Sequence, residues 1–260
     1  MKDTKVKESF ICYFDLLGYK EYLRIKGEEQ YLKLVNVIVE SIIKSIQDIN
    51  YRLSTFMETY HLSKKAFINY RIFSDNVIMA VEMVGNDYFN VKILQTIVSH
   101  VAELQTHLLL RYEATIRGAI IKGNVYFDKN FVFGEGLIQS YIYENDLAIY
   151  PRMLIDNECN KLLSKEMRLK RQFVEYMDAW IDVTSDTYEY VLQDGDGFYF
   201  VNYLFNEKSR EEIAKNIKGH KRAISKLLES AENLRIYQKY SWCCSYHNKV
   251  CEKYRFQEKI

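Results

Sequence analysis

Proline and glycine are scarce in this sequence of 260 residues, which has one Pro and ten Gly. It has no run of about 18 apolar residues, so a membrane-spanning helix is not expected. The N-terminus, Met-Lys-Asp-Thr-Lys, lacks the apolar core of a signal peptide. The formal net charge of +1 favours binding to neither nucleic acid nor an acidic membrane. The five Cys residues have no framework spacing, so we expect a reducing, cytoplasmic location.

Three common active-site motifs are also absent: G-x-x-x-x-G-K-[ST], G-x-G-x-x-G and G-x-S-x-G. P-loop, Rossmann and α/β-hydrolase chemistry therefore lose support. Hydrophobic residues make up 48% of the chain and aromatic residues 15%, which is typical of a globular protein with a full core. We expect a core over residues 1–156 and an elaboration of the same domain over 157–260.

The most informative stretch is residues 10–20, Phe-Ile-Cys-Tyr-Phe-Asp-Leu-Leu-Gly-Tyr-Lys. It predicts a buried strand over 8–15 that ends in Asp15, a small turn at Gly18 and a helix over 19–49. A carboxylate at a strand end beside a helix N-terminus suits a divalent cation that carries a polyphosphate. The alternative is an Asp that only caps the following helix.

The elements expected next are strands 66–73 and 76–84, a helix over 87–113, and strands 114–121 and 124–128 separated by a turn at Gly123. The order strand, helix, strand, strand, helix, strand is that of the ferredoxin-like βαββαβ arrangement, an antiparallel sheet with both helices on one face. Its first and third strands are neighbours. We therefore expect Asp15 to converge with Asp75, which lies in the turn between the second and third strands.

The remaining segments predict a C-terminal hairpin and helical elaboration of this α+β fold. They are a helix over 134–148, an extended run over 151–156, a helix over 157–177, strands 187–193 and 197–203, a helix over 207–240 and a charged tail over 241–260. Residues 194–197, Asp-Gly-Asp-Gly, indicate a hairpin turn rather than a calcium site.

Several side chains admit two interpretations. Arg117 and Lys122 lie on a strand with glycines at either end, where a ligand could approach or where the charges are simply solvated. Arg71 shares a strand face with Asp75 and could donate to a base carbonyl or pair with a carboxylate. Cys243, His247 and Cys251 share a helical face; zinc is conceivable there, but ordinary helix residues are the favoured interpretation.

Four segments follow one another along the chain: Phe14-Asp-Leu-Leu-Gly-Tyr19, Ser74-Asp75-Asn76, Arg117-Gly118 with Gly123, and residues 133–144. In this order, and over residues 8–156, they resemble the two metal motifs, the strand that follows them and the dimer-interface helix of class III nucleotidyl cyclases. The aromatic residue of the first motif is shifted relative to the family pattern. Within that superfamily the chain is most similar to the bacterial pyrimidine cyclases of Pycsar anti-phage systems, through Ala148-Ile-Tyr-Pro-Arg152 and the hairpin over 194–202.

The resemblance implies a role for individual residues. Asp15, Asp75 and the Leu16 carbonyl would hold two Mn²⁺ or Mg²⁺ ions. The N–H groups of Leu17, Gly18 and Tyr19 would hold a triphosphate. Arg71, with Tyr70 beside it, and Phe131 would select the base.

The implied reaction is the conversion of UTP to 3′,5′-cyclic UMP and pyrophosphate, with CTP as the alternative substrate. The implied partners are a second copy, with sites at the interface, and a downstream effector that responds to the cyclic nucleotide. Ile138 and Ile142 occupy the offsets where the family has its transition-state Asn and Arg. Arg117, Arg152 or a partner-chain cation could replace them. Otherwise the chain is a nucleotide-binding sensor without activity, or a polymerase on the related palm fold.

Overall fold

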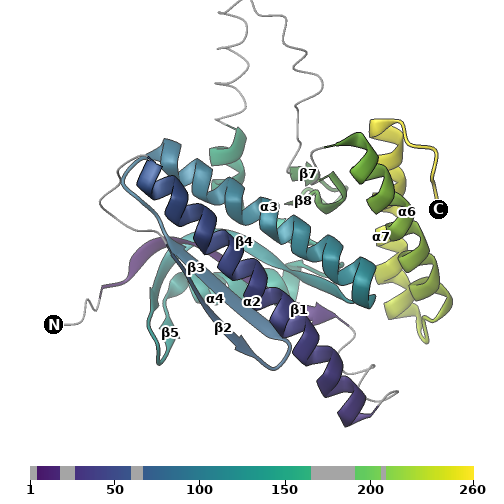
Figure 1. Cartoon of the computed structure of the whole chain (residues 1–260), viewed down its shortest axis with the longest axis horizontal. Coiled ribbons are helices and arrows are strands. Elements are labelled where there is room, and N and C mark those ends of the chain that lie inside the picture. The colour runs from purple at the N-terminus through teal and green to yellow at the C-terminus, as the bar shows by residue number, and fades with distance from the viewer. Residues whose placement is uncertain (1–4, 18–26, 60–66, 165–190, 206–208) are drawn as a thin grey trace, which may run out of the picture.

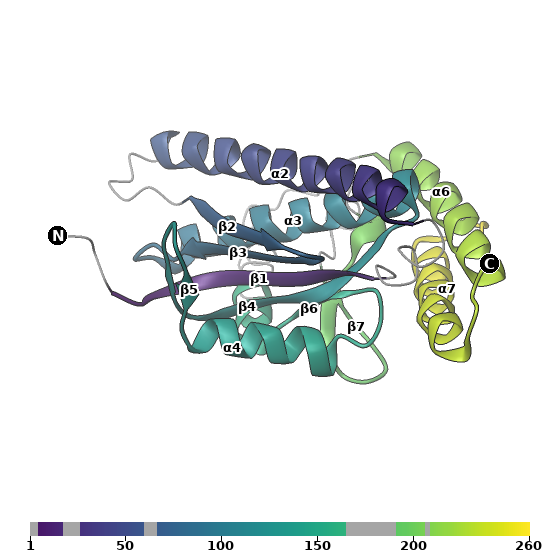
Figure 2. The ribbon, with the colours of Figure 1, turned by 90° about the horizontal axis from the view of Figure 1, so that it is seen from below.

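The structure is a computed structural model that describes residues 5–17, 27–59, 67–164, 191–205 and 209–260. One mixed sheet forms its centre (Figure 1). Helices α2 (Glu28–Thr59) and α3 (Asp87–Tyr112) cover one face of the sheet, and α4 (Glu135–Ile142) lies on the other face (Figure 2). The predicted α+β class is confirmed. No helix in these segments has the length and apolarity needed to cross a bilayer.

The sheet has the order β2-β3-β1-β4-β6-β8-β7, and β5 pairs with β4 outside this path. The strands are β1 (Lys7–Leu17), β2 (Ile68–Phe73), β3 (Asn76–Glu82), β4 (Thr115–Phe127), β5 (Val132–Phe133), β6 (Met153–Ile155), β7 (Val191–Gln193) and β8 (Tyr199–Val201). Strand β1 is antiparallel to both β3 and β4, whereas β6 joins β4 in parallel. Asp15 therefore lies opposite Asn76 on one side and Arg117 on the other.

Helix α2 begins and ends later than the expected range 19–49. Its buried side chains recur at helical spacing: Ile38, Ile42, Ile46, Ile49, Leu53 and Met57. Leu53 and Met57 continue the stripe through residues where a loop was expected, so the helix extends to Thr59. Residues 18–26, which include the expected helix start, lie outside the described residues.

The expected turn at Gly123 is wrong, because β4 is one continuous strand of 13 residues. A Cβ atom at Gly123 would lie 2.8 Å from the Cα of Gly136, which belongs to α4. The glycine therefore allows the helix to approach the strand closely rather than turning the chain. The expected helix over 134–148 is present as α4, which passes into a π-helical turn over Tyr143–Leu147.

The expected helix over 207–240 and the charged tail after it are also wrong. Two helices occupy this region, α6 (Arg210–Glu229) and α7 (Leu234–Tyr254). The Asn233 side chain accepts a hydrogen bond from the N–H of Ile236 and starts the second helix. The predicted hairpin around residues 194–197 is confirmed by β7 and β8, which join the same sheet through β6. Residues 157–164 are helical, and the rest of the expected helix to 177 lies outside the described residues.

Two stacked, fully buried histidines join α6 to α7. His247 Nε2 lies 2.6 Å from the Glu258 carbonyl, which can only accept, so Nε2 carries the proton. Neutral His247 then accepts at Nδ1 from His220 Nδ1–H at 3.1 Å, and His220 Nε2 accepts from the Tyr203 hydroxyl at 2.9 Å. His247 is thus engaged in a hydrogen-bonded chain. Among the described residues, no group of three His, Cys, Asp or Glu side chains is arranged to hold a metal ion.

The histidine chain predicts acid sensitivity. Burial lowers the pKa of both His220 and His247. Below about pH 6.5 the unfolded chain therefore binds protons at these two residues, whereas the folded protein does not. Stability should fall with decreasing pH by about 1.4 kcal/mol per pH unit for each such histidine. Urea unfolding at pH 7 and pH 5.5 should show a smaller fall for His220→Gln than for the unchanged protein. Equal falls would contradict the assigned proton positions.

Gly118 provides a second test of the fold. A Cβ atom there would lie 2.0 Å from the Tyr13 carbonyl oxygen on β1, whereas one at Gly85 would meet nothing within 4 Å. We expect Gly118→Ala to destabilise the protein by about 3 kcal/mol or more, because the two central strands must separate. Gly85→Ala is the matched control and should melt near the temperature of the unchanged protein. Similar melting of both variants would contradict this packing.

Candidate functional site

Asp15 and Arg117 meet side by side at one end of the sheet. Arg117 Nε donates to Asp15 Oδ1 at 3.0 Å, and Nη2 donates to Oδ2 at 3.1 Å. The two residues are direct partners in the antiparallel pair of β1 and β4, so their side chains point to the same face. That face is the one that carries α4. Their side chains are 15% and 17% exposed, so the pair is largely shielded from water.

The turn between β2 and β3 brings Asp75 to the same end of β1. The Asp75 carbonyl accepts from Leu16 N–H at 3.0 Å, and its carboxylate accepts from the Asn76 amide at 3.1 Å. The Tyr13 hydroxyl donates to Asn76 Oδ1 at 3.0 Å and holds the turn against β1. Asp75 lies close enough to Asp15 for its charge to act on that carboxyl group. The two aspartates therefore lie at the same end of β1, as expected.

Glu144 is a third carboxylate at this site, and our sequence analysis did not include it among the site residues. It lies in the π-helical turn after α4, and its Oε1 is 2.7 Å from Arg117 Nη2. Arg117 also donates to the Ala148 carbonyl at 3.3 Å. The guanidinium group therefore lies between two carboxylates from distant parts of the chain. The available signal was an acidic residue at the end of the helix that the sequence predicts over 134–148.

The electrostatics show an excess of negative charge. Burial, followed by the charge of Asp15, raises the pKa of Glu144 to about 7. Burial also raises the pKa of Asp15, although Arg117 opposes this shift. Asp75 adds its charge to both groups. Asp15 and Glu144 thus share the Arg117 guanidinium group while the charge of Asp75 acts on both, an arrangement that a further cation would stabilise.

The donor set fits a divalent cation in its chemistry. Carboxylate oxygens are the ligands that Mg²⁺ and Mn²⁺ prefer. Glu144 Oε1 is buried and has no hydrogen-bond partner among the described residues, because its contact with Arg117 lacks hydrogen-bond geometry. Both Asp15 oxygens, however, accept from Arg117. A cation that binds Asp15 must therefore compete with Arg117 for one of these oxygens.

Two of the expected base-selecting residues meet at another turn. Arg71 donates to the Asp128 carbonyl, and Phe131 N–H donates to the Asp128 carboxylate at 3.0 Å. Tyr70 packs against the core on the opposite strand face from Arg71 and does not share this position. Leu17 ends β1 opposite Thr115, while Gly18 and Tyr19, the other expected triphosphate ligands, lie outside the described residues.

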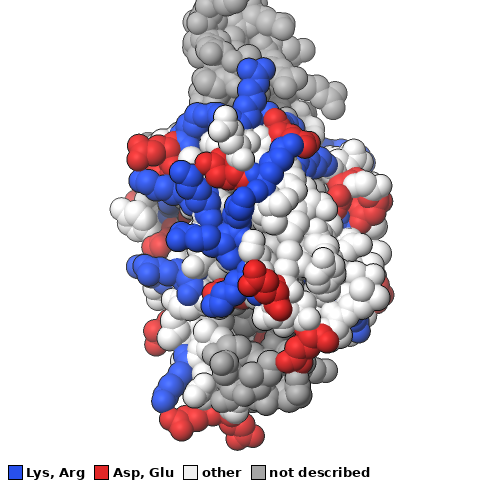
Figure 3. Space-filling model, turned by 90° about the vertical axis from the view of Figure 1, so that its right-hand side faces the viewer, with Lys and Arg blue, Asp and Glu red and all other residues white. Residues whose placement is uncertain are grey.

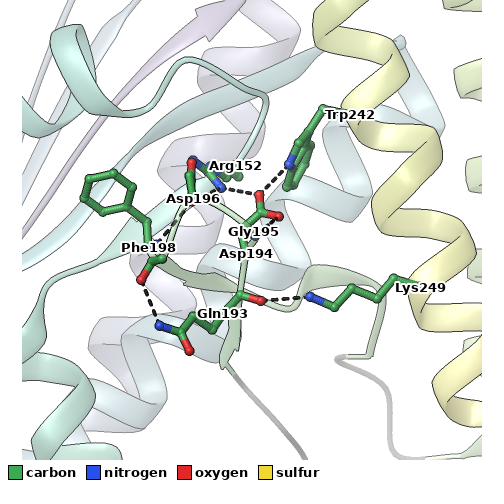
Figure 4. Close-up of polar contacts among 9 residues, drawn as sticks. Arg152, Gln193, Asp194, Gly195, Asp196, Phe198, Trp242 and Lys249 are labelled. Atoms are coloured by element: carbon green, nitrogen blue, oxygen red, sulfur yellow. Dashed lines mark hydrogen bonds and ion pairs between the residues drawn. The ribbon is translucent and has the colours of Figure 1, made fainter.

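Arg152 lies in a separate buried cluster (Figure 4). Its side chain is 0% exposed and forms ion pairs with Asp194 and Asp196 of the β7–β8 hairpin. Its guanidinium carbon is 5.6 Å from the centre of the Trp242 ring, which stacks on Tyr150. We call these five residues the Arg152 cluster. Of the two arginines proposed to replace the family's transition-state residues, only Arg117 contacts the carboxylates at the end of β1.

Apolar side chains are exposed on the outer side of α4. Ile138 and Ile142 are 61% and 43% exposed, and Tyr141 between them is also exposed. Tyr141 packs edge-on against Tyr13, whose other neighbour is the exposed Phe73. Aromatic side chains thus connect α4 to the turn that contains Asp75, and they lie beside the carboxylates.

Comparison with known proteins gives little. No protein-family model matches the sequence, and no curated protein matches it significantly. Among solved structures, the chain is similar to a class III adenylyl cyclase-like ATP-binding protein from Pseudomonas aeruginosa, with 14% sequence identity and a TM-score of 0.35. The match covers 60% of this chain and 35% of the other, so this chain spans about a third of that protein.

The raised pKa of Glu144 predicts a pH-dependent substitution effect. Between about pH 4.5 and pH 7 the folded protein holds a proton on Glu144 that the unfolded chain releases, so this group destabilises the fold as the pH rises. Glu144→Gln should therefore be more stable than the unchanged protein at pH 8 and lose this advantage at pH 5, as measured by urea unfolding. Asp146→Asn, in the same turn but exposed, is the control. An advantage of equal size at both pH values would contradict the prediction.

Proposed function

We propose that this protein is a nucleotidyl cyclase that converts UTP to 3′,5′-cyclic UMP and pyrophosphate, with CTP as the alternative substrate. The observation that carries the proposal is the convergence of Asp15 on β1 with Asp75 in the β2–β3 turn. The motifs that resemble class III cyclases contain these two aspartates, and the strands that hold them are adjacent in the sheet. The strand order β2-β3-β1-β4 supports the proposal, because a ferredoxin-like core is expected for such a cyclase.

In the proposed reaction, the ribose 3′ oxygen forms a bond to the α-phosphorus while the bond to the leaving pyrophosphate breaks. Mn²⁺ or Mg²⁺ ions held by Asp15, Asp75 and the Leu16 carbonyl would acidify the hydroxyl group and neutralise the phosphates. Arg117 is already aligned on Asp15 and supplies positive charge beside the reacting phosphate. Arg71 and Phe131 are the proposed base-selecting residues, because the turn at Asp128 holds them together.

The apolar outer side of α4 supports a homodimer. Exposed apolar side chains that adjoin a polar site are typical of a surface covered by a partner. A second copy seated on Ile138 and Ile142 would cover the carboxylates and exclude water. We propose, as the resemblance implies, that the product activates a downstream effector in anti-phage defence.

A nucleotide-binding sensor without activity is the second candidate. The observation that favours it is the pair Ile138 and Ile142, which have no group to stabilise a phosphorane-like transition state. Such a sensor would be stabilised against heat by UTP with Mn²⁺ but would release no product.

The test is to incubate the purified protein with all four ribonucleoside triphosphates and Mn²⁺ and to separate the products by mass. We expect cyclic UMP or cyclic CMP, and Asp75→Asn should reduce the rate at least 100-fold while the variant remains folded. Asp146→Asn should retain full activity. A folded Asp75→Asn variant with normal activity would disprove the proposed mechanism, and products longer than one nucleotide would indicate a polymerase.

A further inference from the structure

The guanidinium group of Arg117 lies between two carboxylates and forms hydrogen bonds with only one of them. Its Nε donates to both oxygens of Asp15, at 3.0 and 3.2 Å, and its Nη2 donates to Oδ2 at 3.1 Å. Nη2 also lies 2.7 Å from Glu144 Oε1, but in a direction that gives no hydrogen bond. Asp15 is therefore fully engaged, whereas Glu144 Oε1 has no hydrogen-bond partner in the part of the chain that the structure describes.

The segment after α4 offers Arg117 a second set of acceptors. Glu144 lies in the π-helical turn, and Ala148 follows that turn directly. The Ala148 carbonyl already accepts from Arg117 Nη1 at 3.3 Å. The Glu144 side chain is only 5% exposed, and a buried carboxylate oxygen without a donor is unfavourable. A hydrogen bond from Arg117 to Glu144 would remove this penalty.

Arg117 and a divalent cation compete for Asp15. The two positive charges repel each other, and the cation requires an oxygen to which Arg117 now donates. The antiparallel pairing of β1 and β4 fixes the backbone of Arg117 opposite Asp15, so only the guanidinium group needs to shift. Its Nη2 is already 2.7 Å from Glu144 Oε1. A small shift therefore releases Asp15 and supplies the missing donor to Glu144.

A further metal ligand and an ordinary ion pair are the alternative roles for Glu144. In the described ranges, no three His, Cys, Asp or Glu side chains are arranged to hold a metal ion, so a role through Arg117 fits better than a place among the ligands. Figure 3 shows Lys and Arg side chains gathered on the face formed by α6 and α7, where pairs such as Lys215 with Glu211 are exposed. Such pairs join one cation to one carboxylate in water and contribute little. Arg117 instead lies between two shielded carboxylates.

We propose that Glu144 is a positioning residue that accepts Arg117 when a divalent cation binds to Asp15. This inference rests on the proposed function and deepens it, because it assigns how the cation gains access to the carboxylate. Arg117 has two arrangements, one on Asp15 and one on Glu144 with the Ala148 carbonyl, and the cation favours the second. Arg117 thereby stays beside the site in both arrangements and keeps its positive charge available to a phosphate group.

A double-mutant cycle on Mn²⁺ affinity tests the inference. Calorimetry without nucleotide, at pH 8 and so above the raised pKa of Glu144, gives the dissociation constants of the unchanged protein, Glu144→Gln, Arg117→Met and the double variant. We expect Glu144→Gln to weaken Mn²⁺ binding at least tenfold more when Arg117 is present than in the Arg117→Met background, because only Arg117 needs the acceptor. Asp146→Asn, exposed in the same turn, should have the same small effect in both backgrounds. An equal effect of Glu144→Gln in both backgrounds would show that its charge acts directly on the cation and would overturn the inference.

A crystal structure of the unchanged protein with Mn²⁺ is the second measurement, and it does not depend on the folding of any variant. We expect the Arg117 guanidinium group to form hydrogen bonds with Glu144 and the Ala148 carbonyl and to leave at least one Asp15 oxygen to Mn²⁺. Arg117 with all of its present bonds to Asp15 beside bound Mn²⁺ would overturn the inference. So would a structure in which Mn²⁺ does not bind to Asp15.

The outcomes separate this inference from the proposed function, because neither measurement uses a nucleotide. If the protein makes a cyclic nucleotide but Glu144→Gln has the same effect on Mn²⁺ affinity in both backgrounds, Glu144 has no such role while the cyclase remains. If no nucleotide is converted but the effect depends on Arg117 and the guanidinium group moves to Glu144, the exchange stands without the reaction.

Discussion

The burial of one arginine connects the distant parts of this structure. A guanidinium group with no exposed surface is strongly unfavourable unless carboxylates and hydrogen-bond acceptors surround it. Arg152 at the start of β6 meets this need through Asp194 and Asp196 of the β7–β8 hairpin and through the rings of Tyr150 and Trp242. Three elements are thereby held together: strand β6, the hairpin and α7. The C-terminal region is thus placed by a charge that the chain itself must neutralise.

The carboxylate site has the opposite imbalance, because its partly buried charges are mainly negative. Asp15, Asp75 and Glu144 come from a central strand, a turn and the segment after α4, and Arg117 pairs with Asp15 and Glu144. Burial first, and the charge of Asp15 second, raise the pKa of Glu144. Structural ion pairs normally approach neutrality, because uncompensated buried charge destabilises a fold. A site that keeps excess negative charge in a shielded position is suited to a cationic ligand, and this is the physical reason to expect metal ions bound to a triphosphate there.

The sequence was sufficient to predict the parts of this site that follow local patterns. The strand ending near Asp15, the turn at Asp75 and the strand carrying Arg117 were each recognisable, and their order implied the sheet neighbours that bring them together. Arg152 was a candidate for the site, whereas the structure buries it in the Arg152 cluster. The sequence around a charged residue that follows a proline does not indicate whether its side chain faces a ligand or the core. Gly123 was interpreted as a turn because the sequence does not distinguish a glycine that lets a helix approach a strand from a glycine at which the chain turns. The break between α6 and α7 was missed because its signal is the N-cap at Asn233, whereas the prediction followed the helical spacing of apolar residues.

The position of α7 could not be predicted from a local pattern. It depends on Trp242, which stacks on Tyr150 and donates to Asp194, and therefore on the hairpin and on Arg152. Tyr150 lies two residues after Ala148, whose carbonyl accepts from Arg117. Weakening the Arg152 cluster should therefore disturb the segment that supports Arg117, and with it the end of β1 that carries Asp15. The C-terminal elaboration is thus connected to the carboxylate site through this segment, although the two regions are distant in sequence.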